Sequence, residues 1–132
     1  MNRNIAIKAA MAAVLAVAFC SATLKDKVMT KEKGTYVINT TTLGKDIMGY
    51  NGATPLKVYV KKNKVVKVEA LPNQETPKYW RAASSHLLEK WNGMTVDEAA
   101  EAEIDGRTGA TFSSNAIKQN VQAALDYYKN HK

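Results

Sequence analysis

Two alternating runs of apolar residues constrain the fold of this chain more than any other feature of its sequence. The first run has its apolar positions at Leu56, Val58 and Val60, and the second has them at Val66, Val68 and Ala70. A period of two is typical of strands with one buried face, and the polar link Lys62-Asn63 favours a tight turn between two such runs. The sequence therefore predicts a β-hairpin over residues 56–70.

Other β signals flank the hairpin. Residues 35–42 are rich in β-branched side chains, which favours a strand. Asn51-Gly52 predicts a turn, because both residues tolerate positive φ. A loop bracketed by prolines follows the hairpin at residues 72–78, and residues 103–108 form a further candidate strand.

Helical signals occupy the second half of the chain. One helix is expected to end at Asn92-Gly93, because glycine is common just past a helix end; its apolar stripe comprises Ala83, Leu87, Leu88 and Trp91, with Trp91 expected in the core. Thr95 and Glu98 have the spacing of a capping box that opens a short helix. The last helix is expected to begin near Ser113 or Ser114, and its stripe comprises Ile117, Val121, Leu125 and Tyr128. The sequence thus predicts a single α+β domain, a small antiparallel sheet with helices packed on one side.

The first 22 residues have the layout of a signal peptide. A basic start leads into an alanine-rich apolar run from Ala9 to Phe19, and small residues close the segment at Ala22. The run is shorter than the roughly 20 residues that a membrane span needs, so an uncleaved anchor is the less favoured alternative. We expect a signal peptide over 1–22, a polar tether over 23–34 and the domain over 35–132. Export places the protein in the periplasm or cell envelope, soluble or peripheral to a membrane.

Signal cleavage removes Cys20, the single cysteine of the chain. The mature protein then has no disulfide, thiol nucleophile or cysteine-bound metal. Redox chemistry would require a bound organic cofactor or a metal held by other ligands. No arrangement of serine, histidine and acid suggests a hydrolase, and the sequence predicts neither a catalytic residue nor a metal site.

Much of the +7 net charge is concentrated on the predicted hairpin, where lysines occupy positions 57, 61, 62, 64 and 67. Nucleic acid is not expected as a partner, because no recognition motif accompanies these lysines and export argues against it. Two interpretations remain open. The lysines form either a solvated edge that resists strand addition, or a docking surface for an acidic redox partner or anionic lipid headgroups.

Residues 105–114 have the composition of an anion-binding turn that precedes a helix. Gly109 can take positive φ and lets a bulky group approach the backbone. Amides around the turn and at the helix start can converge on a phosphate, and hydroxyls are available at Thr108, Thr111, Ser113 and Ser114. The alternative is an ordinary turn in which Ser114 caps the helix.

The segment Thr108-Gly109-Ala110-Thr111-Phe112-Ser113 resembles the flavinylation motif of FMN-binding domains, in which Ser/Thr-Gly-Ala-Thr precedes one residue and Ser/Thr. Such domains occur in subunits of the sodium-translocating quinone reductase and its ferredoxin-linked relative. The resemblance covers about residues 46–128 and includes, in family order, Gly49-Tyr50-Asn51-Gly52, Glu75-Thr76-Pro77 and Asp105. The chain departs from the family pattern at Gly106-Arg107, where a small or apolar pair is usual, and at Lys78-Tyr79-Trp80, where glycines are usual.

The resemblance implies that the Thr111 hydroxyl carries FMN as a phosphodiester. A flavin transferase with a divalent metal forms this bond from FAD and releases AMP. Gly109 and Ala110 would allow the transferase to approach the acceptor closely. The other residues that the resemblance places at the cofactor are Thr108, Ser113, Ser114, Glu75, Thr76 and Asp105.

Two of these assignments have alternatives in the sequence itself. Glu75 and Thr76 would orient polar groups of the flavin or phosphate, or would bond nearby backbone in a loop that ends at Pro77. Trp80 lies closer to this loop than Trp91 does, and is therefore the better candidate to stack on the isoalloxazine ring.

The resulting expectation is an exported electron-transfer flavoprotein that relays electrons in the cell envelope through covalent FMN. Its partners would be a flavin transferase and a membrane redox partner or another electron donor and acceptor. The protein would be a redox carrier and not an enzyme. The alternative is a flavin-free exported binding module that uses its basic hairpin to dock an envelope protein or an anionic surface.

Overall fold

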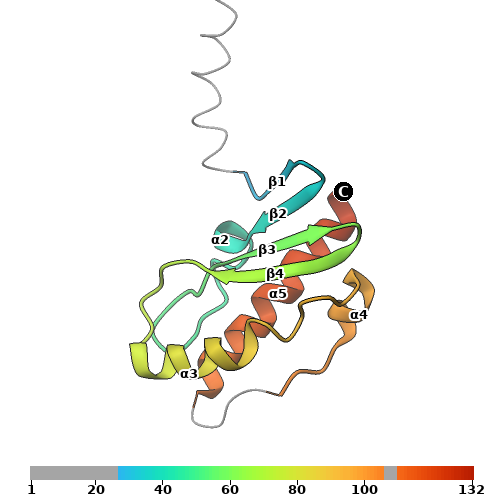
Figure 1. Cartoon of the computed structure of the whole chain (residues 1–132). Coiled ribbons are helices and arrows are strands. Elements are labelled where there is room, and N and C mark those ends of the chain that lie inside the picture. Colours follow the sequence, from blue (N-terminus) through green and yellow to red (C-terminus); the bar gives the residue numbers. More distant parts are fainter. Residues whose placement is uncertain (1–26, 106–109) are drawn as a thin grey trace, which may run out of the picture.

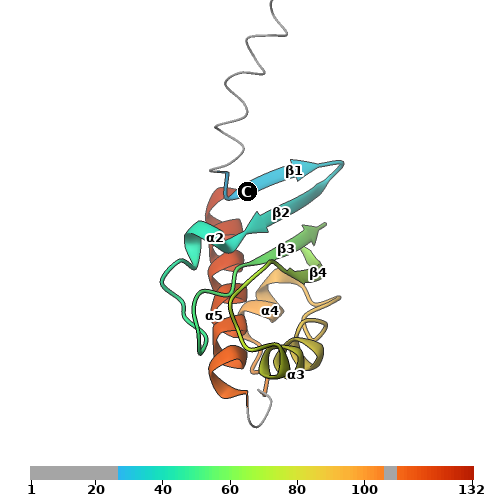
Figure 2. The same cartoon turned by 90° about the vertical axis from the view of Figure 1, so that its left-hand side faces the viewer.

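A four-stranded antiparallel sheet with helices on one side forms the domain (Figures 1 and 2). The computed structural model describes residues 27–105 and 110–132. The strands lie in the order of the chain and comprise β1 (Met29–Glu32), β2 (Thr35–Asn39), β3 (Leu56–Lys61) and β4 (Lys64–Ala70). The helices comprise α2 (Thr40–Leu43), α3 (Pro77–Leu87), α4 (Val96–Glu101) and α5 (Thr111–His131). The predicted α+β fold is confirmed.

The predicted hairpin is confirmed as β3 and β4, with one difference in register. Lys62 and Asn63 take φ values of 52° and 63°, the left-handed conformation that tight hairpin turns require. The pairing shifts between Tyr59 and Val60, so that Val65 pairs with Val60. A bulge of this kind adds one residue to one strand. Val65 therefore points into the core, and Val66, which the alternation assigned to the buried face, is exposed.

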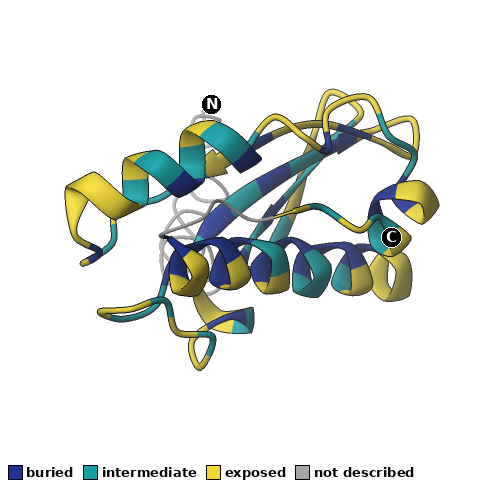
Figure 3. Cartoon of the chain, turned by 90° about the horizontal axis from the view of Figure 1, so that it is seen from below, coloured by how far each residue is buried: buried dark blue, intermediate teal, exposed yellow. Residues whose placement is uncertain are grey.

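The core lies between the inner face of the sheet and α5 (Figure 3). The predicted stripe of the last helix is confirmed, because Ile117, Val121 and Leu125 are fully buried and Tyr128 nearly so. Tyr128 meets Tyr36 of β2 edge to face, with ring centroids 5.1 Å apart. Trp91 is buried in the same cluster, as its spacing predicted.

The capping box at the start of α4 is confirmed. The Thr95 hydroxyl accepts from the Glu98 amide at 3.1 Å, and the Glu98 carboxylate accepts from the Thr95 amide at 2.9 Å. The preceding helix ends sooner than its stripe predicted. α3 stops at Leu87, and the chain continues through turns to Gly93, which has φ +88°.

Three other predictions about elements are corrected. Residues 29–32, expected within the tether, pair with β2 as an edge strand, because ladder hydrogen bonds do not depend on apolar side chains. The strand expected over 35–42 ends at Asn39, whose side chain accepts from the Thr41 amide and caps α2. Residues 103–105 of the candidate strand 103–108 are not in a strand, and residues 106–108 lie outside the described part of the chain.

Within residues 27–105 and 110–132, no helix has the length and apolar composition needed to cross a membrane.

Candidate functional site

Thr111 is the first residue of α5, which begins earlier than the sequence predicted. The residue before the helix is Ala110, which provides no side-chain cap. The Ser114 amide donates to the Ala110 carbonyl at 2.9 Å, so Ser114 lies inside the first turn and is not the cap. The first amides of a helix have no hydrogen-bond partner within the helix, and they form the positive end of its dipole. Thr111 therefore lies where backbone N–H groups favour an anion.

The carboxylate of Glu75 holds together three segments beside Thr111. Its Oε1 accepts from the Tyr50 amide at 2.9 Å and from the Ser113 hydroxyl at 2.5 Å. Its Oε2 accepts from the Asn51 amide at 2.6 Å. The Glu75 side chain is 6% exposed, and both of its oxygens accept hydrogen bonds from the protein. Glu75 thus links the turn at residues 49–52 to the first turn of α5.

These hydrogen bonds set the charge state of Glu75. Burial raises the pKa of a carboxyl, because it penalises the charged form. Hydrogen bonds donated by Ser113 and by the backbone of residues 50–52 oppose this, and their sum holds the Glu75 pKa below its ordinary value. The group is therefore a carboxylate at neutral pH, and its charge is compensated by donors from within the domain.

Gly49 allows this contact. A Cβ on Gly49 would overlap both Oε1 and Cδ of Glu75. Gly49 also donates its amide to the Gly52 carbonyl at 2.8 Å, which closes the turn and agrees with the turn predicted at Asn51-Gly52. The glycine thus lets the loop backbone approach the buried carboxylate.

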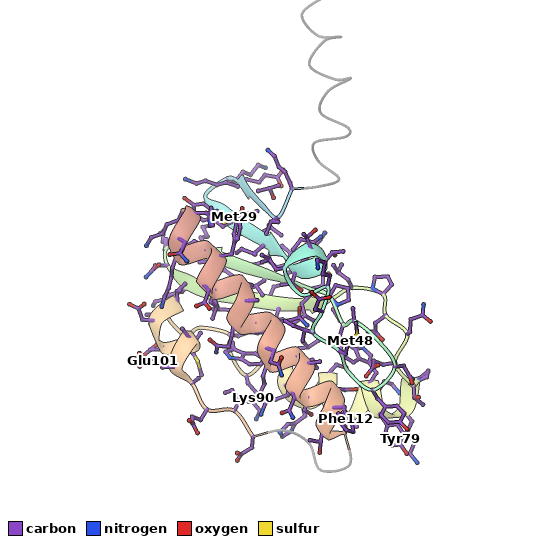
Figure 4. All side chains as sticks on the ribbon, turned by 180° about the vertical axis from the view of Figure 1, so that it is seen from behind. Met29, Met48, Tyr79, Lys90, Glu101 and Phe112 are labelled. Atoms are coloured by element: carbon purple, nitrogen blue, oxygen red, sulfur yellow. The ribbon has the colours of Figure 1, made fainter. Side chains whose placement is uncertain are left out.

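A cavity of about 290 Å³ opens at the start of α5, lined by Tyr50, Tyr79, Ala110, Thr111, Phe112 and Ser113. Its three aromatic rings are exposed, at 70% for Tyr50, 44% for Tyr79 and 60% for Phe112. The rings of Tyr50 and Phe112 are 5.8 Å apart between centroids. Figure 4 shows Phe112, Tyr79 and Met48 at the same end of the molecule, far from Met29. Exposed apolar groups gathered in this way indicate a surface that binds something.

The other predicted site residues lie at different places, and only some of them are close to the cavity at Thr111. Ser113 is buried beneath Thr111 against Glu75, and Ser114 is buried one residue further on. Thr76 is at the edge of the site, where its hydroxyl accepts from the Asn51 side chain at 3.2 Å. Thr108 and Gly109 lie outside the described residues.

Trp80 and Asp105 do not line the cavity at Thr111. Trp80 is half-buried and packs against the core, whereas its neighbour Tyr79 borders the cavity. Asp105 borders a separate, shallow depression beside the middle of α5, and its backbone carbonyl is 3.2 Å from His86 Nε2. Of these two neighbours on α3, Tyr79 and not Trp80 lines the cavity.

Tyr50 and Phe112 are site residues that the sequence did not single out, although both lie within segments that carry the family resemblance. Phe112 follows Thr111 directly and lies off the buried stripe of α5, and its position was the signal available in the sequence. Tyr50 showed no such signal, because its approach to Phe112 depends on how the 49–52 turn packs. In the described ranges, no group of three or more histidine, cysteine and acidic side chains could hold a metal ion.

Comparison with known protein families identifies the family of this chain. The family model described as the FMN-binding domain matches residues 49–126, which include the turn at Gly49, the Glu75 loop and all but the last turn of α5. A search of curated proteins finds no match. The matched region contains every residue that lines the cavity at Thr111.

Proposed function

The chain belongs to the FMN-binding domain family and is a flavin-binding protein, and on that premise we propose that it carries FMN covalently on Thr111 and relays electrons outside the cytoplasm. The observation that carries the proposal is the position of Thr111. It is exposed, begins α5 and borders the aromatic cavity. Its hydroxyl makes no hydrogen bond among the described residues.

The attachment is a phosphoryl-type transfer from FAD. The Thr111 Oγ1 forms a bond to the phosphorus on the riboflavin side, the pyrophosphate P–O bond breaks, and AMP leaves. The hydroxyl proton is released in the same step. A flavin transferase is the partner that catalyses it, and Thr111 supplies the acceptor oxygen.

The residues present fit this group. The amides of the first turn of α5 and the helix dipole favour the phosphate, while Tyr50, Tyr79 and Phe112 offer aromatic faces for the ring. Bound FMN supplies electron transfer through its isoalloxazine ring. The role of Glu75 is indirect, because its carboxylate fixes Ser113 and the Tyr50 backbone on either side of the cavity.

Two further features support the parts of the proposal that concern export of the protein and electron relay. The layout of residues 1–22 supports export to the periplasm or cell envelope. The exposure of all three rings supports a carrier role, because a cofactor held among them stays accessible to a redox partner at a membrane. Among the described residues that line the cavity, none is a histidine, an aspartate or a glutamate.

The test is the intact mass of the exported protein after co-expression with a flavin transferase, with in-gel flavin fluorescence beside it. We expect a gain of one FMN less water on the peptide that contains Thr111. Thr111→Val should abolish the gain and leave the far-ultraviolet circular dichroism unchanged. Thr111→Ser should keep it, because the acceptor oxygen remains.

Thr42→Val is the matched control, because it removes an exposed threonine hydroxyl that does not line the cavity. It should retain the full mass gain. Covalent flavin in Thr111→Val, or an unmodified wild-type protein under these conditions, would contradict the attachment. The second result would favour non-covalent flavin or the flavin-free binding module.

A further inference from the structure

The strand register brings lysines from two hairpins to one end of the domain. Thr35 of β2 pairs with Lys61 of β3, so the turn between β1 and β2 lies beside the turn between β3 and β4. The C-terminus of α5 reaches the same place, because Tyr128 donates to the Asn63 side chain at 3.2 Å. Figure 1 shows both turns and the C-terminus together. We define the lysine end by its five exposed lysines, Lys31, Lys33, Lys61, Lys62 and Lys64.

The positive charge of the lysine end is largely uncompensated. No ion pair among the described residues involves its five lysines. Nearby acids are few, and two of them are engaged elsewhere: Asp97 lies 3.5 Å from Lys129, and Glu98 is held in the capping box. Glu32 on β1 remains as a neighbouring negative charge.

Two of these lysines are directly opposed. Lys61 and Lys64 are cross-strand partners that close the β3–β4 turn, and like charges in that arrangement are destabilising. An anionic ligand at the lysine end would relieve this repulsion. The arrangement thus weakens the isolated domain in a way that binding would reverse.

The composition of the lysine end fits a lipid surface better than a protein partner. Protein interfaces are enriched in aromatic residues and arginine and depleted in lysine. The lysine end contains no arginine, and the exposed large apolar side chains of the described chain are Met48, Tyr50, Val66, Tyr79 and Phe112. Of these, Val66 belongs to the sheet, Tyr50, Tyr79 and Phe112 line the cavity at Thr111, and Met48 lies at the same end of the molecule as that cavity (Figure 4). Clustered lysines without apolar anchors suit the diffuse negative potential of anionic headgroups.

We propose that the lysine end docks the domain on an anionic phospholipid surface, with the Thr111 cavity facing away from it. α5 has 21 residues, which makes it about 30 Å long, and it places Thr111 at one end and the lysine end at the other. The docking goes beyond the electron-carrier function and does not depend on flavin.

The test is co-sedimentation of the full chain, without a flavin transferase, with vesicles of phosphatidylcholine alone or mixed with phosphatidylglycerol. The measured quantity is the partition coefficient on the mixed vesicles divided by the partition coefficient on vesicles of phosphatidylcholine alone. We expect a ratio well above one that falls as NaCl is raised. Lys33→Gln and Lys64→Gln should each lower the ratio about fivefold, and the double variant should lower it by roughly the product of the two.

Lys78→Gln/Lys90→Gln is the matched control, since it removes two exposed lysines of α3 and the segment after it and should leave the ratio within about twofold of wild type. Equal partition into both kinds of vesicle, or equal losses in the control, would overturn the proposal. Binding of an acidic polypeptide such as polyglutamate without any preference for anionic vesicles would also overturn it. None of these readouts involves flavin, so failure here is distinguishable from failure of the Thr111 assignment.

Discussion

Gly49 lies against the carboxylate of Glu75, and this contact lets the Tyr50 and Asn51 amides reach the carboxylate oxygens. The same carboxylate accepts from the Ser113 hydroxyl two residues after Thr111. A small change at a residue that does not line the cavity can therefore move both of its walls.

Gly49→Ala should destabilise the domain by about 1–3 kcal/mol, because the added Cβ overlaps a buried and hydrogen-bonded carboxylate that has no room to move. The measurement is urea unfolding of four proteins: wild type, Gly49→Ala, Glu75→Ala and the double variant. In the Glu75→Ala background, Gly49→Ala should cost much less. Equal costs in both backgrounds would mean that the overlap with Glu75 is not the cause.

Glu75 should also make stability depend on pH. Its pKa is lowered in the folded state, so its contribution is present above the unfolded pKa of about 4.3 and is lost as pH falls through that value and then through the lower folded pKa. The difference in unfolding free energy between wild type and Glu75→Gln should thus be constant near neutrality and shrink below about pH 4.5. Glu89→Gln, which alters an exposed carboxylate without a described hydrogen bond, is the control. A difference that stays flat down to pH 3 would contradict this account.

Asn120 fixes α5 to the segment that leads into the hairpin. It is fully buried, and its Nδ2 donates to the Thr54 carbonyl at 3.0 Å, the Thr54 hydroxyl at 3.2 Å and the Ala116 carbonyl at 2.9 Å. Its Oδ1 has no described hydrogen-bond donor and faces Gly44, where a Cβ would overlap it. The two N–H groups of the Asn120 side chain are thus shared among three acceptors, and those on Thr54 tie α5 to the segment before the hairpin.

Asn120→Asp should be strongly destabilising at neutral pH, by about 3–5 kcal/mol, because it buries a carboxylate among carbonyl oxygens. Burial raises the pKa of such a carboxyl, so the loss should shrink as pH falls and the group becomes protonated. Asn120→Ser should cost about 1–3 kcal/mol without that pH dependence. Urea unfolding of both variants at several pH values makes the measurement. Parallel pH profiles for the two would show that the buried charge is not responsible.

The elements that the sequence predicted well are those fixed by local patterns. The hairpin follows from alternation and a two-residue turn, and the α4 cap follows from Thr95 and Glu98 three residues apart. The start of α5 was placed too late because Ser114 resembles a cap, whereas tertiary packing buries Ser113 and Ser114 and leaves Ala110 at that position.

The candidate site was predictable only in part, for the same reason. The family resemblance identified Thr111 and Glu75 as site residues. The Tyr50, Asn51 and Ser113 donors to the Glu75 carboxylate lie 24 to 38 residues away in the chain, so no local pattern encodes them. Likewise, Lys31 and Lys33 join the hairpin lysines through the pairing of β2 with β3, which the sequence did not reveal because residues 23–34 read as a tether.

The whole molecule is polar along α5, with exposed aromatic rings at one end and lysines at the other. Positive charge concentrated at one end orients a protein as it approaches a negatively charged surface and raises the rate of productive encounters. Repulsion between the clustered lysines also lowers the stability of the domain, and this loss can be measured on the isolated protein.

Lys64→Glu should stabilise the domain by about 0.5–1 kcal/mol at low salt, because it replaces the Lys61–Lys64 repulsion with an attractive cross-strand pair. The gain should diminish at high salt, where exposed charges are screened. Thermal unfolding at two NaCl concentrations is the measurement, with Lys90→Glu as a control away from the lysine end. A loss of stability in Lys64→Glu would show that repulsion between Lys61 and Lys64 does not destabilise the domain.

In the proposed function, the acceptor threonine is on α5, a helix with nine buried residues, and not on a projecting loop. A group attached there moves little relative to the domain, unlike a cofactor on a flexible segment that moves from one partner to another. It moves when the domain moves. The distance over which such a carrier can exchange electrons is therefore set by how the entire domain diffuses and turns between its partners.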